Sequence, residues 1–326
     1  MTNPKAPVLV LVDHADGLPR GTALELLTAA RDLGEVHAVW IGDAPDDDAT
    51  TRLGEFGAAV VHVVPVAEPA ATLPPAVAAA VVGVLDAVGA GALLLASTFE
   101  NKEVAARVAL AVGAGLVVDA SAVERGADGA VVTTQQAFAA TWTLVGQVTT
   151  ARAVVALKPH ATPARALESP RAPAVRTHEA VAPDPRVRLV ERTPRPSSGR
   201  PDLGDAQVVV VGGRGTGGDF APVEDLADAL GGAVGATRVA TDEGWIGHEA
   251  QIGQTGVTIS PRLYIGAGVS GAVHHRGGMV ASGTVVAVDT DADAPIFEFA
   301  DFGVVGDLFT VLPQAAEEIR RLRAGG

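Results

Sequence analysis

The chain has 326 residues, of which 48% are apolar and 19% charged, with 38 glycines, no cysteine and a formal net charge of −14. This length suits two domains of ordinary size better than one core. The missing cysteine excludes disulfides, thiolate metal sites and cysteine nucleophiles. The acidic balance disfavours binding to nucleic acid or to anionic membrane surfaces.

The first half of the chain alternates short β-branched runs with Ala- and Leu-rich stretches of helical period. Strands are predicted at Val8–Val12, Val36–Ile41, Val60–Val64 and Leu93–Ala96, and helices at Gly21–Leu33 and Asn101–Val112. This alternation favours a largely parallel sheet with helices on both faces, that is, a three-layer α/β/α domain. Residues Gln135–Val155 lack a helical period and predict hairpin strands added to that sheet.

The most apolar window, Ala76–Ala96, is roughly long enough to span a bilayer. Asp86 and three glycines interrupt it, so we interpret it as a helix, a glycine turn and a buried strand at Ala92–Ala96. The first residues contain no apolar run of signal-peptide length before Asp13. We therefore expect a cytoplasmic protein without membrane insertion.

The composition changes between Pro159 and Pro201, where nine prolines and eight arginines occur. Proline removes backbone donors and fixes φ, so this segment predicts a surface connector with one strand at Val187–Glu191. Its arginines are not interleaved with aromatic residues, which favours a solvated linker over nucleic-acid binding. The predicted domains are therefore residues 1–200, ending in this connector, and residues 201–326.

A second α/β unit begins at Gln207 and has the pattern of a Rossmann-like parallel sheet. Its predicted elements are strands at Val208–Val211, Leu263–Ala267 and Thr284–Val288, and helices at Pro222–Leu230 and Gln314–Leu322. Two glycine-rich turns, Gly212–Gly218 and Gly266–Gly271, follow the first two of these strands.

Gly213, Gly215 and Gly218 satisfy the G-x-G-x-x-G pattern of dinucleotide-binding loops. Taken alone, the pattern is equally compatible with a tight turn that binds nothing. Arg214 within the turn favours an anionic ligand. Two such turns at strand carboxyl ends indicate a ligand stretched across one edge of the sheet.

A hydrolase is the alternative that Ser270 raises. Gly268-x-Ser270 resembles part of a nucleophile elbow, but that motif requires glycine where Ala272 stands. A Ser–His–Asp triad of Ser270, His275 and an aspartate stays open as a less favoured alternative.

Two histidines and three aspartates complete the candidate residues. His274 and His275 are adjacent, so they cannot bind one metal ion from the same helix face, and no metal site is predicted. His275 is compatible with donating a hydrogen bond to a ligand or with a structural role. Asp289, Asp291 and Asp293 could bind ribose hydroxyls or could cap turns.

Taken together, a series of blocks between Gln207 and Pro313 resembles the α subunit of the electron transfer flavoprotein family. The blocks are Ala233–Arg238 with Asp242, Gln251–Gly256, Leu263–Ile265, Gly268–Ala272 with His275, Ala294–Gly303 and Gly306–Phe309. They recur in order at the family's spacing and cover about a third of the chain. The first half resembles the family only loosely, through Val8–His14 and Asn101–Asp119.

The resemblance implies one FAD in the carboxyl-terminal domain and a β subunit as partner in a heterodimer. Arg238 would lie against the isoalloxazine ring, the Thr255 hydroxyl near flavin N5, and His275 would donate to the C2 carbonyl. The full set of implied FAD-binding residues is Arg214, Thr237, Arg238, Ile252, Gly253, Gln254, Thr255, Ser270, Gly271, Ala272, Val273, His274, His275, Asp289, Asp307 and Leu308.

The function implied by the resemblance is that of an electron carrier without substrate turnover of its own. It would take electrons from flavin dehydrogenases, such as acyl-CoA dehydrogenases of fatty acid β-oxidation, and pass them to a quinone-linked oxidoreductase. The sequence departs from the family at His274 (usually Gln), at Asp289-Thr290 (usually Asn-Lys) and at Val257 and Gly283 (commonly Lys). These departures leave three alternatives open: a specialised or bifurcating relative, an FAD- or NAD-dependent oxidoreductase, and a cofactor-free interaction protein.

Overall fold

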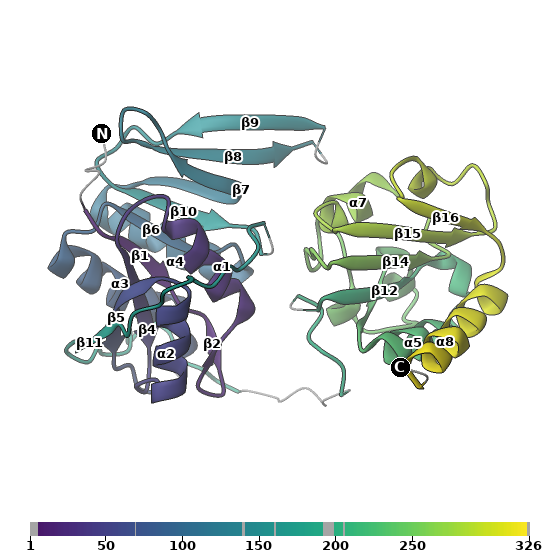
Figure 1. The fold of residues 1–326 in the computed structure, drawn as a ribbon, viewed down its shortest axis with the longest axis horizontal. Coiled ribbons are helices and arrows are strands. Elements are labelled where there is room, and N and C mark those ends of the chain that lie inside the picture. The colour runs from purple at the N-terminus through teal and green to yellow at the C-terminus, as the bar shows by residue number, and fades with distance from the viewer. Residues whose placement is uncertain are drawn as a thin grey trace. The chain divides into compact units, whose positions relative to one another are not determined.

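The computed structural model describes residues 6–68, 70–138, 141–159, 161–191, 199–204 and 206–324 of the chain. It consists of two compact units, one of Met1–Ala137 and Thr141–Pro194 and the other of Phe138–Ala140 and Arg195–Gly326. The described residues form one large sheet in the first unit and a smaller sheet in the second (Figure 1). The predicted fold class, α/β with two domains, is confirmed.

The sheet of the first unit is parallel over most of its width and ends in antiparallel strands. In sheet order its strands are β11 (Ala174–Thr177), β5 (Ala58–Val64), β4 (Val36–Ile41), β1 (Val8–Leu11), β6 (Ala92–Ala96), β10 (Ala153–Leu157), β7 (Gly115–Arg125), β8 (Val131–Ala137) and β9 (Trp142–Gln147). The hairpin predicted within Gln135–Val155 is confirmed in β8 and β9. Its last residues instead belong to β10, which pairs in parallel with both β6 and β7. A short hairpin of β2 (His14–Ala15) and β3 (Leu18–Pro19) follows β1.

Helices cover both faces of this sheet. Val8 and Val10 of β1 lie in one core with α1 (Gly21–Ala30) and α2 (Asp47–Glu55). Leu9 and Leu11 lie in the opposite core with α3 (Pro74–Val88) and α4 (Phe99–Val112). Successive strand residues point to opposite faces, so one short apolar run supplies both cores. The layers are helix, sheet and helix, as predicted for this domain.

The apolar window Ala76–Ala96 forms most of α3, a turn and β6, as its interruptions predict. Gly89 ends α3 in the left-handed conformation at φ 63°, which only glycine adopts without cost. Within the described ranges, no helix combines the length and apolarity needed to cross a bilayer.

The prediction of a strand at Val187–Glu191 is wrong, because these residues adopt no regular structure. The connector supplies its strand earlier, as β11, which pairs in parallel with β5 at the edge of the sheet. The backbone N–H of His178, directly after β11, continues this edge by donating to Val63 O at 2.8 Å. An edge position tolerates the neighbouring prolines because only one side of the strand needs backbone partners.

The second unit is built on a wholly parallel sheet. In sheet order its strands are β13 (Ala233–Ala236), β12 (Val208–Gly212), β14 (Leu263–Ala267), β15 (Thr284–Asp289) and β16 (Phe302–Val305). The first strand in the chain, β12, therefore lies between the second and the third. The order reverses between β12 and β14, and open α/β sheets bind ligands outside strand carboxyl ends at such a point.

Helices α5 (Ala221–Leu230) and α8 (Leu308–Ala324) lie side by side on one face of this sheet (Figure 1), together with α6 (Arg238–Asp242). The other face is covered by α7 (Val273–Met279) and by a core that includes Ile252 and Ile296. Helix α8 begins earlier than the predicted Gln314, because Asp307 accepts a hydrogen bond from Phe309 N at 3.1 Å and starts the helix.

The described residues also form short 3-10 helices. They are η1 (Ala70–Thr72), η2 (Arg214–Thr216), η3 (His248–Ala250) and η4 (Pro295–Glu298).

Candidate functional site

The two glycine-rich turns contact each other at the point where the strand order reverses. Gly213 N donates to Ala267 O at 3.0 Å, and Gly215 N donates to Gly268 O at 3.1 Å. A Cβ atom on Gly215 would lie 2.6 Å from Gly268 Cα, closer than any side chain allows. Gly215 and Gly268 are therefore both required for the contact between the turns, whether or not a ligand is bound. The G-x-G pattern on its own thus reflects the fold as much as a ligand.

A cavity of about 520 Å3 opens beside these turns. Its volume lies within the range of cofactor sites, roughly 300–1,000 Å3. The residues that line it come from the ends of four strands and from the segments that follow them: Arg214, Gly215, Thr237, Arg238, Val239, Ile252, Gly253, Gln254, Thr255, Gly268, Val269, Ser270, Gly271, Ala272, His274, His275, Asp289 and Asp291. Residues far apart in the sequence are thus brought to one place by the parallel sheet.

Two arginines give the cavity its capacity for an anionic ligand. Arg214 and Arg238 both line it, and Arg238 also pairs with Asp242 across one helical turn at 3.2 Å. Thr237 lines the cavity too, but its hydroxyl is buried within the protein and has no hydrogen-bond partner among the described residues.

Thr255 on the cavity wall is connected to a buried amide beneath it. Gln251 is buried and its Nε2 lies 2.9 Å from Thr255 Oγ1. On the other side of the amide, Thr241 Oγ1 lies 2.7 Å from Gln251 Oε1. The sequence did not single out Gln251 or Thr241 as site residues, because only the folded structure brings their side chains into contact with each other and with Thr255.

His275 is buried and fully hydrogen-bonded within the domain. Its Nδ1 lies 3.1 Å from Ile252 O, and its Nε2 lies 2.7 Å from the Tyr264 hydroxyl. A carbonyl only accepts, so Nδ1 carries the hydrogen and Nε2 accepts from Tyr264. Burial lowers the pKa of His275 to about 4, so the ring is neutral near pH 7.

The predicted hydrogen bond from His275 to a flavin carbonyl is therefore not supported, because neither ring nitrogen has a hydrogen left to donate. The Ser–His–Asp alternative is not supported either, since the ring nitrogens contact Tyr264 and Ile252 rather than Ser270. The sequence left a structural role open for His275, and these contacts favour that role.

The aspartates after β15 cap turns. Asp289 Oδ1 accepts from Asp291 N at 3.0 Å, and Asp291 Oδ1 accepts from Asp293 N at 3.0 Å. Asp289 and Asp291 also line the cavity, so the two roles that the sequence left open are compatible. Each carboxylate keeps its second oxygen for another partner.

The structure gathers all but three of the predicted site residues at the cavity. Val273 is the first residue of α7; it is 64% exposed and does not line the cavity. Asp307 caps α8, and Leu308 is buried in the core beneath that helix. Five lining residues were not among the predicted FAD-binding residues: Gly215, Val239, Gly268, Val269 and Asp291. Three of these, Gly215, Val239 and Val269, adjoin predicted residues in the chain, and the two glycines belong to the motifs already noted. For Asp291 the sequence left ribose binding and turn capping open.

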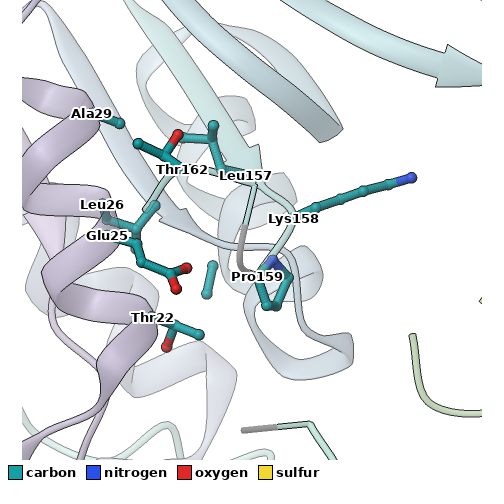
Figure 2. Close-up of a pocket in the computed structure, with 9 residues that line it drawn as sticks. Thr22, Glu25, Leu26, Ala29, Leu157, Lys158, Pro159 and Thr162 are labelled. Carbon is teal, nitrogen blue, oxygen red and sulfur yellow. The ribbon is translucent and has the colours of Figure 1, made fainter. Parts of the chain in front are cut away.

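A second hollow lies in the first unit, between α1 and the end of β10 (Figure 2). Thr22 and Glu25 of α1 face Leu157 and Pro159 across it, while Lys158 extends away (Figure 2). Its volume is about 10 Å3, which is about the space of one water molecule. It is too small to hold a cofactor.

Both units match families of known proteins. Residues 8–183 match the electron transfer flavoprotein domain, and residues 202–280 match the electron transfer flavoprotein FAD-binding domain. The chain is 41% identical over 320 residues to the electron transfer flavoprotein subunit alpha of Mycobacterium leprae, covering 97% of this chain and 98% of the relative. It is 36% identical over 315 residues to the subunit alpha of Syntrophomonas wolfei (96% and 98% covered) and 33% identical over 329 residues to protein FixB of Azorhizobium caulinodans (96% and 88% covered).

These matches, together with one largely parallel and one wholly parallel sheet, define a two-domain α/β electron transfer flavoprotein that has FAD as its cofactor. The chain belongs to the electron transfer flavoprotein α-subunit family, as the ordered sequence blocks predict. Membership of this family implies a β subunit as partner. The family name describes a carrier of electrons.

Proposed function

We propose that FAD occupies the cavity at the β12–β14 switch point. The observation that supports this most is the pair of arginines, Arg214 and Arg238, on the wall of a cavity of about 520 Å3. Two guanidinium groups at one cavity suit a ligand that carries phosphates. Both arginines lie in the segment that matches the FAD-binding domain. FAD supplies a flavin ring that takes up and releases electrons.

Arg238 would tune the cofactor. A guanidinium on the cavity wall stabilises negative charge that develops on a ring when it is reduced, and so raises the reduction potential. Asp242 offsets part of this effect through its pairing with Arg238. Asp289 and Asp291 would bind hydroxyl groups of the ligand, because carboxylates repel phosphates and accept from hydroxyls. The backbone of Gly253 and Gln254 and the turn Ser270–Ala272 would hold the remaining polar groups.

In the cell, we propose, the chain forms a heterodimer with a β subunit and works in the cytoplasm as a carrier without substrate turnover. Its donors would be flavin dehydrogenases, such as acyl-CoA dehydrogenases, and its acceptor a quinone-linked oxidoreductase. The family relationship supports this role, and no catalytic acid–base pair stands out among the described cavity residues. His274, exposed at the cavity, is the residue through which substrate chemistry would have to act.

The proposal is tested by co-expressing the chain with its β subunit and measuring the flavin content and midpoint potential of the complex. We expect bound FAD, and we expect Arg238→Ala to keep the fold while lowering the potential by about 30 mV, which is ~1.4 kcal/mol for two electrons. Arg321→Ala removes the same charge from the exposed surface of α8 and serves as the control. A folded complex that contains no flavin, or equal potentials for both variants, would refute the proposal.

A further inference from the structure

Gln251 lies directly below the cavity wall and contacts two hydroxyl groups. Its Nε2 is 2.9 Å from Thr255 Oγ1, and its Oε1 is 2.7 Å from Thr241 Oγ1. Gln251 is 6% exposed and Thr241 is 3% exposed, while Thr255 faces the cavity. The three side chains therefore form a row that runs from the protein interior to the ligand site.

The Thr241 hydroxyl has one hydrogen but two acceptors within reach. One is Gln251 Oε1 at 2.7 Å, and the other is the backbone oxygen of Arg238 at 2.9 Å. If the hydrogen goes to Gln251, the amide donates to Thr255. If it goes to Arg238 O, the Thr241 oxygen is free to accept, and a reversed Gln251 amide is satisfied just as well.

The two amide orientations give Thr255 opposite hydrogen-bonding character at the cavity. In the first, Thr255 accepts from Gln251 Nε2 and its own hydrogen points outward as a donor. In the reversed orientation, Thr255 donates inward to Gln251 Oε1 and presents only lone pairs to the cavity. Each orientation keeps every buried polar atom of the amide paired, so neither incurs the cost of an unsatisfied group.

We propose that Gln251 is a positioning residue whose amide reverses with the redox state of the bound flavin, so that Thr255 donates to the oxidised ring and accepts from the reduced ring. This inference rests on the proposed function. An oxidised flavin presents ring nitrogens with lone pairs. On reduction, the ring would take two electrons from the donor protein and one proton from solvent, and one ring nitrogen would then carry a hydrogen. Reoxidation would remove the two electrons and the proton. A fixed hydroxyl would suit one of these states only.

The test is nuclear Overhauser spectroscopy on the complex with its β subunit, carrying labelled glutamine side-chain amides and threonine methyl groups. In the oxidised complex we expect the Gln251 amide hydrogens to lie nearer the Thr255 methyl group. After reduction with dithionite we expect them to lie nearer the Thr241 methyl group. Identical contacts in both states would overturn the proposal.

Variants provide a second, independent readout. Gln251→Met keeps the length of the side chain but removes both hydrogen bonds, so we expect the dissociation constant of FAD to rise about tenfold in both redox states. Thr241→Ser keeps the hydroxyl and should bind FAD as the unmodified chain does, whereas Thr241→Val should weaken binding. Gln314→Met, on the exposed surface of α8, is the matched control. Binding by Gln251→Met within twofold of the unmodified complex would overturn the proposal.

The outcomes separate this inference from the proposed function. If the unmodified complex binds FAD but the Gln251 contacts do not change on reduction, the positioning role fails and the FAD site stands. If the unmodified complex binds no FAD, both fail.

Discussion

His62 of β5 is completely buried and lies in the middle of a row of histidines in the first unit. Its Nε2 is 3.0 Å from His37 Nδ1, and its Nδ1 is 2.8 Å from His178 Nε2. His37 Nε2 in turn lies 2.9 Å from the carboxylate of Glu35. Because that carboxylate accepts, every hydrogen in the row points towards Glu35 when the three rings are neutral.

This row predicts acid sensitivity. Burial, followed by the nearby rings of His37 and His178 and by Arg176, lowers the pKa of His62 to about 4. The unfolded chain, with an ordinary histidine pKa of about 6.5, binds the proton first, so stability is complete above that value and is lost as pH falls towards 4. We expect the free energy of unfolding of the first unit to drop by about 2 kcal/mol between pH 7 and pH 5 from this residue.

Urea denaturation at the two pH values measures this effect. His62→Gln keeps a donor and an acceptor at the position but does not titrate, so most of the difference should disappear in that variant. An undiminished difference would show that the acid sensitivity of the first unit does not arise at His62.

Residue types predicted which groups could meet a ligand, but not how they are already engaged. Arg238, Thr255 and His275 were all chosen from sequence blocks. Only the structure reveals that both nitrogens of His275 are bonded to Tyr264 and Ile252. A hydrogen-bond partner distant in the chain leaves no periodic signal in the sequence, so its presence could not be inferred.

At the scale of elements, the two glycine turns determine the shape of the site. They follow β12 and β14, which are hydrogen-bonded neighbours, and their backbones touch without intervening side chains. The positions of the glycines were visible in the sequence. The contact between the turns depends on β12 and β14 being adjacent, which results from the crossover of the chain through β13.

We expect Gly213→Ala to separate the turns. A methyl group there would overlap the carbonyl oxygen of Gly268, and neither backbone can move without disturbing the strand ends. The variant should lose about 2–3 kcal/mol of stability, as overpacked cores do, and should bind FAD less tightly. Thermal denaturation and flavin titration measure the two effects.

Gly83→Ala is a matched control within a helix. Gly83 lies in α3 with ordinary backbone angles and open space where a Cβ would stand. Alanine should stabilise the first unit by about 0.5–1 kcal/mol, because it restricts the unfolded chain. If both glycine variants had the same effect, the close contact between the turns would not be the cause.

At the scale of the whole molecule, each unit has cores of its own on both faces of its own sheet. A unit that buries its apolar residues internally can fold alone. We therefore propose residues 201–326 as an FAD-binding domain in its own right. Expressed separately, this segment should show α/β circular dichroism and one cooperative unfolding transition, and failure to unfold cooperatively would contradict it.

The sequence by itself determined the α/β class, most strands and helices, the family and most of the residues that gather at the cavity. These depend on local periodicity, on glycine positions and on blocks of residues in a fixed order, all of which are readable along the chain. The tertiary structure alone decided that the connector's strand is β11 rather than Val187–Glu191, that Asp307 and Leu308 serve α8, and that Gln251 lies beneath Thr255. Each of these depends on which distant backbone or side chain satisfies a polar or apolar group, and that choice is made only when the sheet brings them together.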